Sequence, residues 1–172
     1  MQLNLGPRLP PATAKLATLP NGAAGVRETL HIMAKMAREG KKTLPVRLAA
    51  QQIVQSLPQQ DWLGEVSVMH EFVRDRIRYV RDIRGVETLQ QPERTLQLKS
   101  GDCDDKSMLL ASLLEAIGHR ARFHAVGFQP GKYSHVYTET LVGKRWLPLE
   151  TTEPWEAGRT PPAVVSHMIV HV

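Results

Sequence analysis

The hydrophobic pattern of this chain changes at Gly118, and that change limits the fold more than any other feature of the sequence. Before Gly118 the apolar residues recur at the spacing of amphipathic helices, whereas after it they alternate as in half-buried strands. Helices followed by strands predict an α+β fold, in which helices pack against an antiparallel sheet. The 172 residues suit one domain. We expect that domain to span 25–172, helical over 25–118 and mainly β over 119–172.

The segment before this domain has a different composition. Residues 1–24 are rich in Pro, Ala, Leu and Gly. Proline fixes its own backbone and interrupts helices, so we expect an extended or flexible N-terminal arm.

Four helices are expected before Gly118. Their predicted spans are 25–38, 43 to before Pro58, 61–79 and 103–117, with Thr43 and Asp61 as N-caps. Residues 82–100 carry turn signals at Gly85 and Pro92, and we predict a loop there.

Four strands are expected after Gly118, with spans 120–128, 133–142, 145–150 and an edge strand within 164–172. Gly143-Lys144 predicts a tight turn between the second and third strands. If Leu141 pairs with Trp146 across this turn, Glu150 lies one diagonal step from His135 on the same face of the sheet.

The composition excludes several classes of protein. The net charge of +5 is too small to indicate a nucleic-acid-binding protein. Cys103 is the single cysteine, so neither an internal disulfide nor a four-thiolate zinc site can form. The sequence shows no secretory signal and no apolar run long enough to cross a membrane, which predicts a cytoplasmic protein without membrane contact.

Cys103 stands out because it begins a predicted helix in the polar turn Gly101-Asp102-Cys103-Asp104-Asp105. Free backbone N–H groups and the helix dipole favour a nucleophilic thiolate at such a position. The neighbouring aspartates are expected to cap the helix, and their charge opposes the thiolate. A cationic partner is therefore needed, and His135 at the mouth of a strand could act as base and imidazolium.

A third group should orient the imidazole by accepting its other N–H. Glu150 is the candidate from the predicted strand register, with Glu153 in reserve. The backbone N–H of Cys103, at the start of the helix beside Asp102, would supply one oxyanion donor, with Gln97 or Gln91 as candidates for the second.

Several of these segments resemble the transglutaminase-like superfamily, which shares a papain-like core. They are the Gly101–Asp105 turn with its Leu-rich helix, His135-Val136-Tyr137, and the run Trp146-Leu147-Pro148-Leu149-Glu150-Thr151-Thr152. The resemblance covers roughly 60–153 and implies Cys103 as nucleophile, His135 as base and acid, and residue 150 as the third member. The family usually has Asp where this chain has Glu150. The compact domain is also similar to bacteriophage and prophage proteins.

The predicted function is a cysteine peptidase or amidase that cleaves amide or isopeptide bonds through a thioester, with a protein or peptide substrate and no cofactor. One alternative is a crosslinking transglutaminase, in which an amine replaces water as acceptor. Another is a structural or assembly component that keeps the fold without turnover, for example in a phage virion beside other phage structural proteins.

Two further interpretations concern charged clusters. Asp102, Asp104, Asp105 and His135 superficially resemble calcium ligands, but most of a calcium-binding loop is missing, so no metal is expected. The arginines at 74, 76, 78, 81 and 84 fit a solvated helix end, and a patch for an anionic surface is the alternative. No aromatic residues alternate with them, so nucleic-acid binding is not expected.

Overall fold

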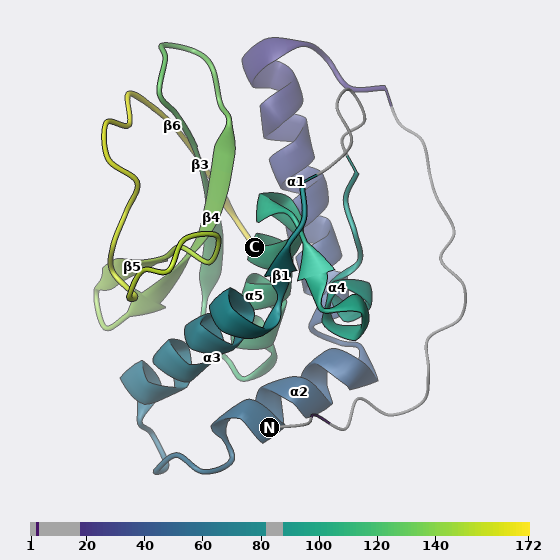
Figure 1. Ribbon diagram of the computed structural model, residues 1–172, viewed down its shortest axis with the longest axis vertical. Helices are drawn as coiled ribbons and strands as arrows, with labels where there is room; N and C mark the ends of the chain where they lie inside the picture. Colours follow the sequence, from purple (N-terminus) through teal and green to yellow (C-terminus); the bar gives the residue numbers. More distant parts are fainter. Residues whose placement is uncertain (1–2, 4–17, 82–87) are drawn as a thin grey trace.

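The computed structural model describes residue 3, residues 18–81 and residues 88–172. The elements in this part of the chain are α1 (Gly22–Gly40), α2 (Leu44–Val54), α3 (Trp62–Arg76), β1 (Arg78–Tyr79), α4 (Pro92–Leu98), β2 (Ser100–Gly101), α5 (Cys103–Ala116), β3 (Ala121–Gly127), β4 (His135–Val142), β5 (Arg145–Leu149) and β6 (Ser166–His171). Helices come first and the main sheet second, which confirms the α+β prediction (Figure 1).

The main sheet has the strand order β5-β4-β3-β6, and every neighbouring pair is antiparallel. The β4–β5 register pairs Leu141 with Trp146 and Thr138 with Leu149, as predicted from the Gly143-Lys144 turn. The tail forms β6 at the sheet edge beside β3, which was also expected. This register brings the residue after β5 back toward the beginning of β4, where His135 lies.

Helix α5 is the central element, because it lies between the sheet and the other helices (Figure 1). Every residue from Asp104 to Leu114 is buried. Leu109 and Leu113 pack in one apolar cluster with α2 and α3, whereas Met108 and Ala111 pack in a second cluster with α1 and the inner face of the sheet. A helix with apolar contacts on all sides is held rigidly, so its first residue has a fixed place.

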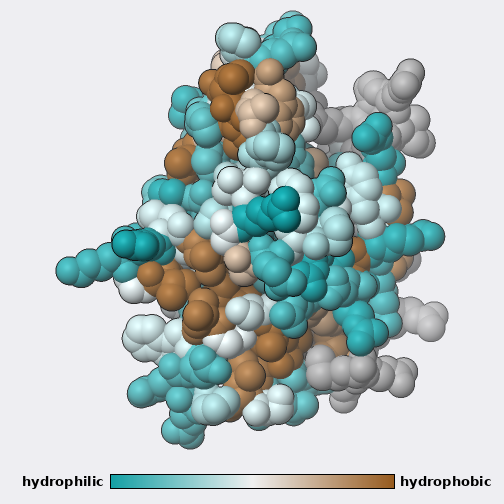
Figure 2. Space-filling model, turned by 60° about the vertical axis from the view of Figure 1, so that its left-hand side comes forward, coloured by the Kyte–Doolittle hydropathy of each residue, from teal (hydrophilic) through white to brown (hydrophobic). Residues whose placement is uncertain are grey.

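The opposite face of the sheet is less uniform. Figure 2 views the side of the molecule that carries the sheet, and apolar residues there gather in separate areas broken by polar ones. The chain does not use this face as its main core.

Several boundaries and one segment differ from the sequence-based predictions. Helix α1 begins at Gly22 rather than Gly25, and β4 begins at His135 rather than Tyr133. Helix α3 ends at Arg76 rather than Tyr79, because residues 78–79 form β1. The prediction of a loop over 82–100 was wrong for residues 92–98, which form α4, and for Ser100, which pairs with β1. Residues 88–91 form no helix or strand, as predicted, and residues 82–87 lie outside the described residues. Pro92 occupies the first turn of that helix, where proline is well tolerated. The turn signal was therefore a helix start.

Parts of the predictions lie outside the described residues. They include most of the arm 1–24, together with Arg84 and Gly85. Among the described helices, none combines the length and the apolar character required to cross a bilayer.

Candidate active site

Cys103 is the first residue of α5, and the turn before it is shaped to cap this helix. The Oδ1 atom of Asp102 accepts hydrogen bonds from the N–H groups of Asp104 and Asp105, at 3.0 and 3.1 Å. A Cβ atom at Gly101 would lie 2.5 Å from the Cβ atom of Asp105, so this position needs glycine. The capping role predicted for Asp102 is confirmed, and it fixes Cys103 at the helix tip.

The surroundings of the Cys103 thiol disfavour its ionisation. Burial raises the pKa of the Cys103 thiol, and the carboxylates of Asp104 and Asp102 raise it further. The thiol donates a weak hydrogen bond to Oδ1 of Asp104, at 3.5 Å. Burial and the two carboxylates outweigh the favourable end of the helix dipole, so the thiol form dominates while these carboxylates keep their charges.

His135 and Glu150 form a closely matched pair. Nε2 of His135 lies 2.5 Å from Oε2 of Glu150, whose side chain is 1% exposed. The other carboxylate oxygen accepts hydrogen bonds from the backbone N–H and the hydroxyl of Thr152, both at 2.7 Å. Burial alone would raise the pKa of Glu150, but the His135 and Thr152 contacts outweigh it and hold this pKa below its ordinary value.

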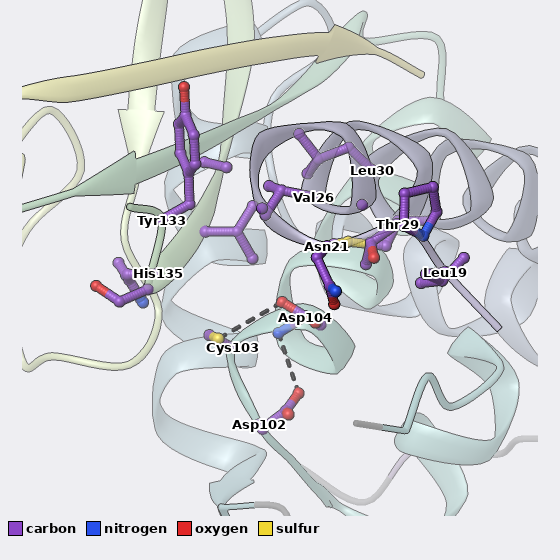
Figure 3. Close-up of a pocket in the computed structure, with 17 residues that line it drawn as sticks. Leu19, Asn21, Val26, Thr29, Leu30, Asp102, Cys103, Asp104, Tyr133 and His135 are labelled. Atoms are coloured by element: carbon purple, nitrogen blue, oxygen red, sulfur yellow. Dashed lines mark hydrogen bonds between the residues drawn. The ribbon is translucent and has the colours of Figure 1, made fainter. Parts of the chain in front are cut away.

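Cys103 and His135 line the same pocket, which has a volume of about 320 Å³ (Figure 3). Cys103 reaches it from the N-terminus of α5, and His135 reaches it from the start of β4. The Glu150 contact uses Nε2 of His135 and leaves Nδ1 as the ring nitrogen able to exchange a proton with a neighbour. The structure thus brings a thiol, an imidazole and a buried carboxylate together.

Other residues singled out in the sequence lie elsewhere or serve other contacts. Gln97 belongs to α4, accepts a hydrogen bond from Arg94, and is not among the described residues that line the pocket. Gln91 is the N-cap residue of α4 and is likewise absent from that lining. Glu153 is exposed. The Asp102 carboxylate accepts hydrogen bonds at the helix cap and donates none there.

Two buried residues behind the site were missed by the sequence analysis. Nε2 of His70 lies 2.6 Å from the backbone oxygen of Glu150, and burial lowers the pKa of His70. The ammonium group of Lys106 donates to the backbone oxygens of Ile77 and Arg74, at 2.7 and 3.3 Å. His70 lies on the apolar face of α3, between Met69 and Val73. A polar residue on an apolar face must find a buried partner, and this pattern in the sequence could have pointed to His70.

The charged clusters are mainly engaged within the protein. Among the described residues, no group of three or more His, Cys, Asp or Glu side chains is arranged to hold a metal ion. Arg74 donates to the Asp75 carboxylate and to the backbone oxygen of Trp155. Arg76 and Arg78 are exposed, as expected for a solvated helix end.

Solved structures resemble this fold at low sequence identity. A candidate protease from Parabacteroides distasonis aligns with a TM-score of 0.61 and 14% identity over 83% of this chain and 32% of its own. A candidate cysteine protease from Cytophaga hutchinsonii aligns with a TM-score of 0.52 and 15% identity over 73% of this chain and 45% of its own. This chain thus spans less than half of either protein.

A third structure is closer in length. Calcium-bound LapG from Legionella pneumophila aligns with a TM-score of 0.55 and 16% identity, over 79% of this chain and 80% of its own. A sequence search of curated proteins found no match. The sequence model of the transglutaminase-like superfamily matches residues 47–151, which include Cys103, His135 and Glu150. With the family model covering more than half of its length, the chain belongs to the transglutaminase-like superfamily.

Proposed function

We propose that this domain is a cysteine-dependent acyl-transfer enzyme that cleaves peptide or isopeptide bonds through a thioester. The observation that carries the proposal is the His135–Glu150 hydrogen bond at a pocket that the Cys103 thiol also lines. An imidazole whose far nitrogen is fixed by a buried carboxylate is the arrangement that a thiol nucleophile requires.

The reaction begins with attack of the Cys103 sulfur on the substrate carbonyl carbon. The thiol proton passes to Nδ1 of His135 as the S–C bond forms. The tetrahedral intermediate then collapses, the C–N bond breaks, and the leaving amine takes the proton from His135. Water attacks the resulting thioester with His135 again as base, which releases the carboxylic acid and restores the thiol.

The raised pKa of Cys103 determines how this proton transfer is timed. A thiolate that exists before substrate arrives is disfavoured by burial and by Asp104. Proton transfer to His135 therefore accompanies attack, and Glu150 stabilises the imidazolium that forms. The mechanism is therefore general-base catalysis by His135, and it does not depend on a thiolate–imidazolium pair of Cys103 and His135 formed before substrate binds.

The backbone N–H of Cys103 is our candidate for the first oxyanion donor. Asp102 caps the N–H groups of Asp104 and Asp105 with its side chain and that of Lys106 with its backbone oxygen. This capping leaves the Cys103 N–H available at the helix tip, where the dipole favours negative charge.

Hydrolysis is preferred over crosslinking for this domain. A crosslinking enzyme must bind a second, amine substrate and exclude water from the thioester, whereas hydrolysis needs only water as the acceptor. Two of the similar structures are described as candidate proteases, which supports the same choice.

A second candidate is favoured by the electrostatics of the thiol. Burial and two carboxylates hold Cys103 in the thiol form, and that would suit a domain that keeps the fold as an assembly or structural component, such as a phage structural protein. Cys103→Ser separates the candidates. Full biological function of that variant would favour the structural role, and loss of function would favour catalysis.

Acylation by p-nitrophenyl acetate tests the enzymatic proposal directly. We expect release of nitrophenol in a burst that matches the protein concentration, with one acetyl group found on Cys103 by mass spectrometry. His135→Ala should abolish the burst while Cys103 remains present. An acetylated protein in which the label lies on lysines and not on Cys103 would contradict the proposal.

His31→Ala is the matched control, because His31 is exposed on α1 and does not line the pocket. Its burst should equal that of the parent. Equal loss in both histidine variants would point to damaged folding, which thermal unfolding of each protein would reveal.

A further inference from the structure

We propose that the pocket beside Cys103 binds an apolar side chain of the substrate, next to the amide that is cleaved. This inference rests on the function proposed above and names the class of substrate. The peptide would carry a residue such as leucine or methionine beside its scissile bond.

One side of the pocket is an apolar face of α1. Val26, Leu30 and Met33 lie at helical spacing and all line the pocket; Val26 is half-buried, whereas Leu30 and Met33 belong to the buried apolar cluster. Ala125 of β3 and Val136 of β4 lie opposite, and Figure 3 shows Val26 and Leu30 on the helix above Cys103. Transfer of an apolar side chain from water onto the part of this surface that is open, chiefly Val26, is favourable in free energy.

The chain before α1 closes the pocket on another side. Leu19 and Pro20 line it, and a Cβ atom at Gly25 would lie 1.9 Å from the backbone oxygen of Pro20. Only glycine allows the entering chain to lie this close to the helix. The wall is therefore a fixed part of the fold, which favours a preformed binding pocket.

The volume limits what can enter. About 320 Å³ lies at the small end of the range for ligand pockets. It accommodates one or two side chains and excludes a large rigid ligand. A pocket of this size next to a nucleophile fits a substrate side chain held during attack.

The charges at the Cys103 end distinguish between substrate side chains. Asp102 and Asp104 line that end, and among the described lining residues His135 is the only basic one. An acidic substrate side chain would be repelled by these carboxylates, and a lysine would lose hydration on burial. We therefore expect the preference to fall from leucine through lysine to glutamate.

Matched peptidyl fluoromethyl ketones test this order, since each alkylates an active cysteine and can differ from the next in one residue. The probes carry leucine, glycine, lysine or glutamate beside the reactive ketone. We expect leucine to label Cys103 about 10- to 100-fold faster than glycine, from the transfer free energy of the side chain. Glutamate should be slowest, and intact mass over time gives each rate.

Two variants on the same helix connect the preference to the pocket. Val26→Phe fills the pocket and should bring the leucine-to-glycine ratio of labelling rates close to one. Ala24→Phe is the control, because Ala24 is exposed and does not line the pocket, and it should keep the parent ratio.

The outcomes separate this inference from the proposed function. If all probes label Cys103 at similar rates, the pocket does not select an apolar side chain, and the enzymatic proposal stands. A preference for glutamate would also overturn the inference. If no probe labels Cys103 and p-nitrophenyl acetate gives no burst and no acetyl group on Cys103, both proposals fail together.

Discussion

The two halves of the candidate site are built in opposite ways. On the sheet, His135 and Glu150 are joined by a hydrogen bond of 2.5 Å, and Thr152 supports the carboxylate from its other side. On the helix, Cys103 is half-buried beside carboxylates that raise the pKa of its thiol. In the mechanism proposed above, the base is therefore preorganised and the thiol is disfavoured as a thiolate, so we expect the proton-accepting half to supply most of the activation.

Replacement of Glu150 should have the largest effect, because it removes the charge that stabilises the imidazolium. We expect Glu150→Gln to slow acylation by p-nitrophenyl acetate by about 10²- to 10⁴-fold. Glu153→Gln is the control, since Glu153 is exposed, and it should leave the rate unchanged. A small loss in Glu150→Gln would mean that the base half is not the source of activation.

Replacement of Lys106 tests how much stability α5 gains from its hydrogen bonds to the C-terminal end of α3. Lys106→Met removes a donor to two backbone oxygens, and we expect the free energy of unfolding to fall by about 1–3 kcal/mol. Chemical denaturation measures it. Lys35→Met, at an exposed position on α1, should have little effect.

The parent and Lys106→Met should also differ in how their free energies of unfolding depend on pH. Burial lowers the pKa of Lys106 to about 8, from an ordinary 10.5. Between these values the unfolded chain keeps a proton that the folded chain has released, so the stability contributed by Lys106 rises with pH. The difference between the parent and Lys106→Met should therefore grow from about pH 8 to pH 10.5. A constant difference would mean that Lys106 is not held in the way described.

Replacement of Asp104 tests whether its carboxylate raises the pKa of the Cys103 thiol. Asp104→Asn removes one of the charges that raise the pKa of Cys103, so more thiolate forms at neutral pH. We expect iodoacetamide to label Cys103 about 3- to 10-fold faster. Burial is the largest cause of the raised pKa and is unchanged, which limits the gain. Asp61→Asn, in the cap of α3, should label as the parent does, and an unchanged rate in both variants would remove Asp104 from this account.

The smallest effect concerns the support behind the base half. His70→Gln disturbs the contact of 2.6 Å to the backbone oxygen of Glu150, and we expect acylation to slow about twofold to fivefold. Burial lowers the pKa of His70 below 6.5, so the unfolded chain takes up its proton first as the pH falls. The parent should thus lose more stability than His70→Gln as the pH falls below 6.5. Equal losses in thermal unfolding would contradict the buried, neutral state of His70.

Much of the fold could be predicted because its signals are local. The capping residues Thr43, Asp61 and Asp102 mark helix starts, and Gly143-Lys144 sets the register of β4 with β5. That register led from the sequence to Glu150 as the partner of His135. The helix over 92–98 was not predicted, because its first residue is a proline that was interpreted as a turn signal. Its seven residues are also too few to show a clear helical spacing of apolar residues.

The sequence by itself determined the order of the elements and the chemical types at Cys103, His135 and Glu150, since capping, periodicity and turns depend on neighbours along the chain. Only the tertiary structure decided that His70 and Lys106 support the site from behind and that α1 walls the pocket. These contacts join residues far apart in the chain. Their free energies come from burial and desolvation, which depend on packing in three dimensions.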